Sequence, residues 1–471
     1  MAPAASPAVP PDGLPKRERT KVLAIMMSGT TAACISQSMM IAALPTIMHE
    51  FNVDAALGQL LTTAYIFTLG LFSAMTAYLV NRLDTRKLFL ASMGSFVVGC
   101  AASLVAPNYP LLLASRLLQA GGAGIALPLI QVVALSVYPK SEYGKAMGIV
   151  GVIIGFAPAI GPTISGFFID VWGWRSVFVA LGGVTLVVMV LAALFLKDVV
   201  KHESAQARFD VASGLLYTAG FALVLVGVSV MESAGQVSVA AVLPALVGAA
   251  GLAVFAVRQL RIPNPLLKLS CFRDRTFSVG LLLVLLGHIG FMSASIMVPL
   301  FVQDVQGQSA AVSGLTILPG AVLLGFLNPV TGRYLDKHGP KPLIIAGTLL
   351  LVAGTLAFVP LGPGTPEWVV TVLYGVRTVG VACLMMPMTA YACTTLAQDD
   401  IAQGTAIITS LRQIFGSLAS SLLIALMALA SSSPLGIDAF GFGVSFAVQA
   451  AIIAVGGTVG FILVAKGEKG K

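Results

Sequence analysis

Three arginines lie within long apolar stretches of the sequence, and their side chains are the ones best suited to specific chemistry. Arg116, Arg377 and Arg412 each interrupt a run of apolar residues. An arginine at the centre of a membrane-spanning helix costs roughly 2.5–3.5 kcal/mol on insertion scales, so it normally faces a partner or a polar cavity. Arg116 lies only about two helical turns from the boundary at Tyr109 and Pro110, so extension of its side chain to the membrane surface is the alternative. Arg377 lies about three turns into its segment, which favours a buried partner.

Other polar and sulfur-containing side chains in the apolar segments are candidates for lining a central cavity. Hydroxyl, amide and imidazole groups can bind a polar substrate, and flexible methionines can adapt to an apolar one. Plain helix packing is the commoner role of such methionines and remains the alternative. The full set of cavity candidates is Ser36, Gln37, Arg116, Gln119, Gln131, His288, Met292, Arg377, Met385 and Arg412.

The elements that carry these residues are predicted to be membrane-spanning helices. The sequence is 57% hydrophobic and only 10% charged, whereas a soluble domain carries about 25% charged residues. About 20 apolar residues cross the hydrocarbon core as a helix. We therefore predict an all-α integral membrane protein with fourteen spans, at residues 22–45, 57–80, 88–106, 110–137, 144–168, 175–197, 210–231, 237–257, 276–301, 310–331, 343–362, 367–396, 404–430 and 440–465.

Basic residues alternate between consecutive loops of this arrangement, as the positive-inside rule requires. One set of loops holds nearly all the lysines and arginines, and the opposite set is acidic with a single basic residue, Arg175. We predict that both termini are cytoplasmic, with residues 1–21 a disordered N-terminal tail and residues 466–471 a C-terminal tail. The net charge of +8 follows from this topology. The lysines and arginines are not interleaved with aromatic residues on a soluble face, so no nucleic-acid partner is expected.

Two features recur at matching places in the chain. Asn81 and Asp336 lie 255 residues apart in similar loops, and Arg116 and Arg377 lie 261 residues apart in similar spans. A nearly constant offset indicates parallel internal repeats. The prediction is an N-terminal six-helix bundle at residues 22–200, two inserted helices at 201–268 and a C-terminal six-helix bundle at 269–465.

Glycine-containing motifs accompany the repeats. A loop motif of the form G-x-x-x-D-x-x-G-x-[RK] includes Gly332, Arg333, Asp336, Gly339 and Lys341. The fifth span carries small residues and prolines at Gly155, Pro158, Gly161, Pro162 and Gly166. Together with the segment that begins at Arg116, these motifs resemble, in type and order, those of the major facilitator superfamily, specifically its fourteen-helix drug:proton antiporter branch.

The resemblance implies a fold of two six-helix bundles that rock to expose a central site to each side in turn. It implies that the fifth span lies between the halves and shapes this motion, with an ordinary packing seam as the alternative. It also implies that the loop around Asp336 latches the cytoplasmic side, where plain positive-inside topology is the alternative. The earlier copy of this loop has Ala77, Asn81 and Asp84 in place of the glycine, the acid and the second glycine, so a latch there would be weaker or differently paired.

The sequence departs from this branch at one position that bears on energy coupling. Its drug antiporters usually carry an acid in the first span, where this chain has Ser36, and no Asp or Glu lies deep inside any predicted span. Proton coupling needs a group whose protonation changes as it alternates between sides. The protonatable group therefore stays unassigned.

The expected function is multidrug-type efflux of amphipathic small molecules, cations among them, by a proton-coupled monomer in the plasma membrane. The alternative is an uncoupled facilitator, or an exporter of one specific metabolite or lipid. The sequence has no GxxxxGK[ST] motif, no HExxH motif and no nucleophile elbow, so it is not expected to be an enzyme. Its scattered cysteines (Cys34, Cys100, Cys271, Cys383 and Cys393) form no metal-ligand cluster, so no metal or cofactor is expected.

Overall fold

The computed structural model describes residues 15–53, 55–199, 210–234, 238–262, 265–431 and 438–468. Helices dominate these residues. The first half contains α1 (Lys16–Phe51), α2 (Ala55–Val80), α3 (Thr85–Leu104), α4 (Tyr109–Val137), η1 (Lys140–Glu142), α5 (Tyr143–Trp172), α6 (Arg175–Phe195), α7 (Val211–Ala234) and α8 (Val239–Gln259). The second half contains η2 (Leu269–Arg273), α9 (Arg275–Leu300), η3 (Phe301–Val305), α10 (Ala310–His338), α11 (Pro340–Leu356), α12 (Glu367–Leu384), α13 (Met386–Cys393), η4 (Gln398–Asp400), α14 (Ile401–Ala430) and α15 (Ala439–Glu468).

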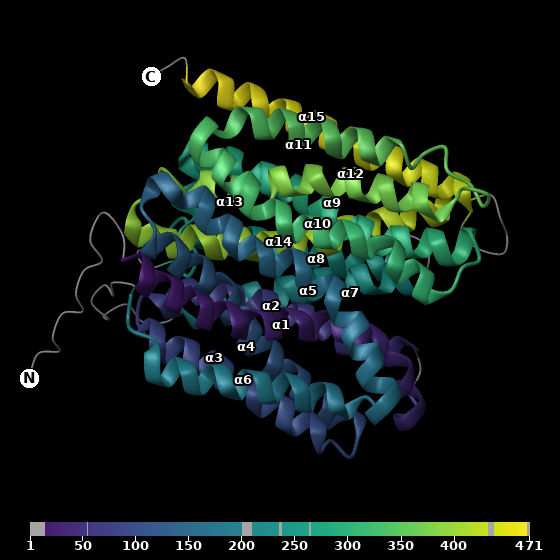
Figure 1. The fold of residues 1–471 in the computed structure, drawn as a ribbon, viewed down its shortest axis with the longest axis horizontal. Helices are drawn as coiled ribbons and strands as arrows, with labels where there is room; N and C mark the ends of the chain where they lie inside the picture. The colour runs from purple at the N-terminus through teal and green to yellow at the C-terminus, as the bar shows by residue number, and fades with distance from the viewer. Residues whose placement is uncertain are drawn as a thin grey trace, which may run out of the picture.

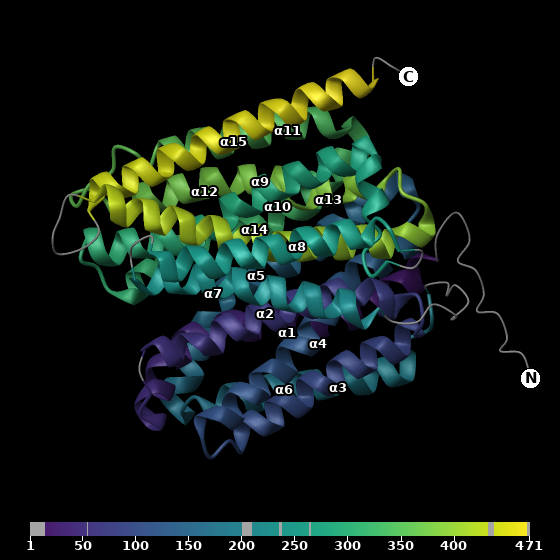
Figure 2. The same ribbon diagram turned by 180° about the vertical axis from the view of Figure 1, so that it is seen from behind.

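The helices form two groups that lie side by side (Figure 1). Helices α1, α3, α4 and α6 lie together in the lower part of the view, and α9, α11, α12 and α15 lie in the upper part. We call α1–α6 the N-terminal bundle and α9–α15 the C-terminal bundle. Helix α5 packs along α10, and α2 packs along α14, so these two pairs join the bundles. The start of α1 and the end of α15 lie at the same end of the molecule in both ribbon views (Figures 1 and 2).

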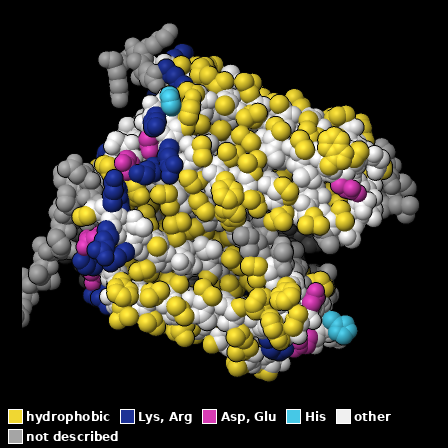
Figure 3. Space-filling view, viewed as in Figure 1, with side chains coloured by type: hydrophobic (Ala, Val, Ile, Leu, Met, Phe, Trp, Pro, Cys, Tyr) yellow, Lys and Arg dark blue, Asp and Glu magenta, His cyan; other side chains and the backbone are white. Residues whose placement is uncertain are grey.

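The exterior matches a lipid environment. Figure 3 shows broad apolar flanks, with the lysines and arginines gathered at the end where α1 begins, which we call the basic end. Large apolar side chains point outward, including Leu194, which is 69% exposed, and Val239, which is 80% exposed. Among the described residues, eleven helices are long and apolar enough to cross a membrane, and shorter apolar helices cover Val211–Gly227 and Pro340–Leu356. The predicted helical membrane class is confirmed.

The two predicted tails are partly helical. Helix α1 already begins at Lys16, inside the segment predicted to be disordered. Arg19 explains this early start, because its guanidinium donates to Glu142 at 3.3 Å and stacks 4.3 Å from the centre of the Tyr138 ring. At the other terminus α15 runs to Glu468, so it includes part of the predicted tail from 466. Residues 1–14 and 469–471 lie outside the described part.

Two predicted spans are divided or markedly shortened in the structure. The span predicted at 367–396 divides into α12 and α13 at Met385. Pro387 lies in the first turn of α13, and because proline has no N–H, the helical bond to the Cys383 carbonyl is missing. The span predicted at 343–362 ends early, since α11 stops at Leu356. Pro360 follows closely, and proline disfavours helical backbone at the residue before it.

Helices α7 and α8 form a hairpin beside the joint between α2 and α14. Their backbones approach closely, because a Cβ added at Gly248 would lie 2.5 Å from the Gly220 oxygen. At the basic end Arg258 pairs with Asp210 at 3.0 Å. Hydrogen bonds from Arg258 and Ser213 lower the pKa of Asp210 to about 2, so this pair stays charged at physiological pH.

Candidate functional site

Arg116 lies at the centre of a polar network inside the N-terminal bundle. Its side chain is 1% exposed, so it does not extend to the membrane surface. One terminal nitrogen donates to the Ser36 hydroxyl at 2.8 Å and to Gln119 Oε1 at 2.7 Å, and the other donates to the Ser36 carbonyl at 3.2 Å. The guanidinium also lies 4.2 Å from the centre of the Tyr65 ring. Gln119 in turn donates to Ser103 at 2.9 Å, so the network ties α4 to α1, α2 and α3.

Arg377 forms the corresponding network in the C-terminal bundle. It is also 1% exposed, and one terminal nitrogen donates to the Gly290 carbonyl at 2.8 Å, to Ser293 at 3.2 Å and to Gln449 Oε1 at 2.7 Å. Gln449 also donates to Ser293. Thus each arginine of the repeat binds a serine, from α4 to α1 in one bundle and from α12 to α9 in the other. Neutral acceptors surround both cations, so each is a buried charge stabilised by hydrogen bonds rather than by an acid.

Arg412 is the third arginine buried within a span; it lies on α14 and is 6% exposed. Its Nε and one terminal nitrogen have no hydrogen-bond partner, and the same holds for the Nε and one terminal nitrogen of Arg377 and for the Nε of Arg116. Its charge acts on His288 of α9 and Cys34 of α1. Both ring nitrogens of His288 are likewise buried without a hydrogen-bond partner. One turn earlier on α14, Thr409 accepts from Gln131 of α4 at 3.5 Å. We call Gln131, His288 and Arg412 the central polar group.

A glycine stripe lets α5 and α10 come into backbone contact. A Cβ added at Gly144 would lie 2.2 Å from the Gly332 oxygen, and one added at Gly148 would lie 2.5 Å from the Asn328 oxygen. Gly155 continues the stripe, with a Cβ position 2.8 Å from the Gly325 nitrogen. Any larger residue here would separate the helices, so the stripe fixes how closely the bundles approach. We call this contact the α5–α10 seam.

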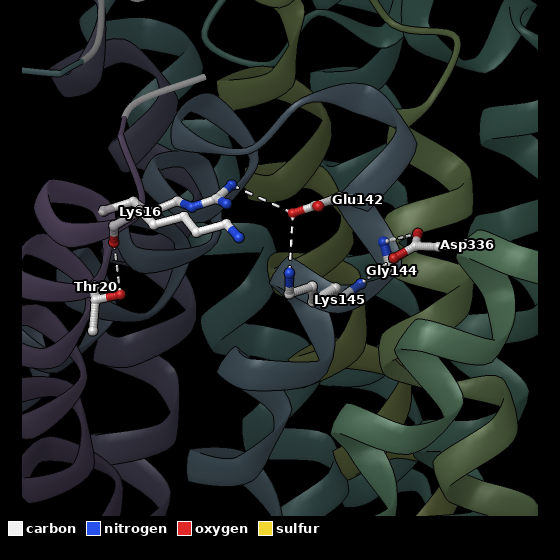
Figure 4. Close-up of polar contacts among 7 residues, drawn as sticks. Lys16, Thr20, Glu142, Gly144, Lys145 and Asp336 are labelled. Atoms are coloured by element: carbon white, nitrogen blue, oxygen red, sulfur yellow. Dashed lines mark hydrogen bonds and ion pairs between the residues drawn. The ribbon is translucent and has the colours of Figure 1, made fainter. Parts of the chain in front are cut away.

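Asp336 closes the basic end of the seam (Figure 4). Its carboxylate accepts from the backbone N–H of Gly144 at 2.7 Å and of Lys145 at 2.8 Å. These are first-turn N–H groups of α5, which have no partner within the helix. Glu142 lies beside them and pairs with Lys145 at 3.2 Å. The negative carboxylate of one bundle therefore caps the positive end of a helix in the other bundle. In the earlier copy of the loop, Asp84 instead pairs with Lys87 of its own segment at 2.6 Å.

Further contacts join the bundles at the basic end. Lys140 donates to the Leu396 carbonyl at 2.9 Å, and Tyr143 donates to Gln398 at 3.5 Å. At the opposite end the surface is hollowed between the bundles (Figure 3). The structure therefore has its basic end closed and its opposite end more open.

The hollowed end contains an ion pair within the N-terminal bundle. Glu50 accepts from the Trp174 ring N–H and from Arg175, each at 2.6 Å. Burial raises the pKa of the Glu50 carboxyl, but the hydrogen bonds from Trp174 and Arg175 outweigh it, so this pKa lies below its ordinary value. Glu50 is therefore ionised at neutral pH, and it holds the end of α1 against the start of α6.

The remaining predicted residues lie at varied places. Gln37 and Met292 are partly exposed, whereas Met385 is fully buried in the core. A Cβ at Gly161 would lie 2.0 Å from Ser38 Oγ, within the N-terminal bundle, and Gly166 has open space around it. Gly339 has a φ of 74°, which L-residues rarely adopt, and it forms the turn between α10 and α11. Arg333 is exposed, Lys341 is partly exposed, and the side chains of Pro158 and Pro162 lie outside the described part.

Several residues of the seam were missed at the level of sequence. Gly144, Gly148, Gly325 and Asn328 all form its backbone contacts. Asn328 also donates to the Gly151 carbonyl at 2.7 Å. The available signal was the recurrence of glycine at 144, 148, 151 and 155, a spacing that places all of them on one helix face.

The arrangement of two bundles with matching buried arginines agrees with the comparisons to known proteins. Residues 26–420 match the Major Facilitator Superfamily. The chain belongs to the major facilitator superfamily. It is 37% identical over 453 residues to the uncharacterized MFS-type transporter YcnB of Bacillus subtilis (strain 168), covering 94% of this chain and 95% of that protein. It is 32% identical over 416 residues to the lincomycin resistance protein LmrB of the same organism, covering 87% and 86% respectively.

Solved structures support the same fold. The human organic anion transporter MFSD10 superposes with a TM-score of 0.69 at 14% identity, covering 96% of this chain and 100% of that chain. The proton:xylose symporter XylE superposes with a TM-score of 0.66 at 14% identity, covering 93% and 95%. This major facilitator protein is thus a multi-span membrane transporter and not an enzyme.

Proposed function

We propose that this major facilitator protein is a secondary exporter of amphipathic small molecules that works by alternating access and is coupled to protons. The observation that carries the proposal is the α5–α10 seam, which is closed at the basic end while the surface between the bundles is hollowed at the other. Its reversal would expose the central polar group to the basic side. The substrate class is supported by the lincomycin resistance relative and by a multidrug resistance protein B homolog of Mycobacterium tuberculosis (strain ATCC 25618 / H37Rv), 29% identical over 421 residues, covering 88% of this chain and 76% of that protein.

The proposed topology has fourteen spans, with α12 and α13 together forming one of them. The N-terminal bundle, the inserted α7–α8 hairpin and the C-terminal bundle would follow the predicted repeat. The gathering of lysine and arginine at one end supports a cytoplasmic basic end in the plasma membrane, and both described chain ends lie there. We propose that a single chain forms the transport unit.

Proton coupling requires a group whose protonation changes during the cycle. Among the described residues whose side chains are buried there is no Asp or Glu, and His288 is the one histidine. We propose His288 as the group whose protonation changes, because it lies in the central polar group between the bundles. The missing acid favours a second candidate, an uncoupled facilitator or an exporter of one specific metabolite or lipid.

An imposed pH gradient across proteoliposomes decides between the two functions. One pH unit stores about 1.4 kcal/mol per proton, which supports roughly tenfold dye accumulation at one proton per substrate. We expect the dye to move against its concentration gradient, and this movement should stop when an ionophore collapses the pH difference. Protein-free liposomes, as the control, should show no such movement. Dye equilibration at the same rate with and without the gradient would leave the facilitator as the function.

A further inference from the structure

The central polar group contains a buried cation with unused hydrogen-bond donors. Arg116 and Arg377 also have unpartnered guanidinium nitrogens, but each binds oxygen acceptors through a terminal nitrogen. Among the described residues Arg412 has no such acceptor, and its Nε and one terminal nitrogen are buried without a partner. Arg412 is nonetheless 6% exposed. Removing a guanidinium from water without a partner is strongly unfavourable. An anionic or strongly accepting group from outside the protein would satisfy these donors.

Arg412 lies where helices of the two bundles meet. Thr409, Arg412 and Gly416 are spaced three and four residues apart, so they share one face of α14. That face meets Gln131 of α4 through Thr409, and its Arg412 charge acts on Cys34 of α1 and His288 of α9. Helices α1 and α4 belong to one bundle and α9 and α14 to the other. A group bound at Arg412 would thus contact both bundles.

The same place offers apolar surface. His288 and Met292 pack closely against Gly416, because a Cβ added there would lie 2.9 Å from His288 Nε2 and 3.2 Å from Met292 Cγ. Met292 is partly exposed, and thioether side chains adapt to varied apolar shapes. Cys34 is also partly exposed. The surroundings suit an apolar body attached to a charged head.

The sign of the buried charge disfavours a cationic substrate. The charged side chains that are buried among the described residues are arginines, His288 is the buried histidine, and there is no buried Asp or Glu. A cationic molecule at Arg412 would meet a like charge in a low-dielectric site and no carboxylate to offset it. An anion would meet an arginine that can form paired hydrogen bonds to a carboxylate or sulfonate.

We propose that the transported molecules carry an anionic head, a carboxylate or sulfonate, which binds the free donors of Arg412 between α1, α4, α9 and α14. This substrate class rests on the proposed transport function. It reverses the expectation from the sequence that cations are among the substrates.

Cys34 provides a probe of the site that needs no known substrate. Its thiolate attacks a methanethiosulfonate, forms a mixed disulfide and releases methanesulfinate. We expect the anionic sulfonatoethyl reagent to label Cys34 about tenfold faster than the cationic trimethylammonium-ethyl reagent, because Arg412 concentrates anions nearby. Labelling of the purified protein is followed by peptide mass spectrometry, with Cys34→Ser as the blank.

Three variants separate charge from folding. Arg412→Gln should bring the ratio of the two labelling rates close to one, and Arg412→Lys should keep most of the preference. Arg273→Gln, which neutralises an exposed arginine in the same half of the chain, should leave the ratio unchanged. Equal rates in the wild-type protein, or an unchanged ratio in Arg412→Gln, would overturn the proposal.

Transport of two dyes with the same ring system separates this inference from the general function. Proteoliposomes should export anionic fluorescein in preference to cationic rhodamine 6G, and Arg412→Gln should reduce fluorescein export at least tenfold. Export of rhodamine 6G alone would refute the anionic site and leave the exporter function standing. Export of neither dye would refute multidrug-type export, and the Cys34 labelling ratio would then decide the charge of the site by itself.

Discussion

Replacing Arg116 by alanine should reduce the transport rate to less than about a tenth of the wild-type rate while leaving protein yield nearly unchanged. The substitution removes three hydrogen bonds to α1 and α4. Ser36 still donates to Gln119 Oε1 at 3.2 Å, so the bundle should fold, but the guanidinium contacts that hold α4 to the hydroxyl and carbonyl of Ser36 are lost. Initial transport rates in proteoliposomes, divided by the amount of monodisperse protein from size-exclusion chromatography, measure the effect.

Arg116→Lys is the informative companion variant. Lysine keeps the charge but cannot reproduce the guanidinium fork that contacts both the hydroxyl and the carbonyl of Ser36. We expect an intermediate rate. Normal transport by Arg116→Ala would mean that the network serves packing alone and has no part in transport.

Gly332→Ala should hold the basic end open and reduce transport. A Cβ at Gly332 would lie 2.0 Å from the Gly144 oxygen, and overpacking of this kind costs about 1–3 kcal/mol. Because the clash exists only when the seam is closed, that energy shifts the balance between the two states roughly 5- to 150-fold. Spin labels at Ser141 and Lys337, on opposite sides of the seam, should report longer distances by double electron–electron resonance.

The matched control for this variant lies on the same helix. Gly314→Ala makes the same chemical change on α10 at a position with no atom within 4 Å of the added Cβ. It should leave both transport and the label distance unchanged. If Gly332→Ala behaves like Gly314→Ala, the seam does not limit closure.

The membrane class and the buried arginines were predictable because both depend on local composition. A run of about 20 apolar residues must form a helix in lipid, and an arginine within it must find a partner. The partners were not predictable, since Arg116 binds Ser36, which lies on α1, 80 residues earlier in the chain. Nothing in the spacing of single residues specifies such a pairing.

The closure of the basic end shows the same limit. The resemblance implied a latch around Asp336, in a loop motif that also contains Arg333 and Lys341. The carboxylate instead binds backbone N–H groups at the start of α5, which carry no sequence signature. The break at Met385 is different, because Pro387 is a helix-breaking signal in the sequence itself, although the predicted span at 367–396 is continuous.

The central claim is that the two ends of this transporter open in alternation. Spin-label pairs test it most directly, one pair at Ser141 and Lys337 at the basic end and a second at Asn52 and Asp304, two exposed positions at the hollowed end. When substrate or pH shifts the population, we predict that one distance lengthens as the other shortens in the same sample. Distances that lengthen or shorten together, or that never change under transport conditions, would contradict alternating access.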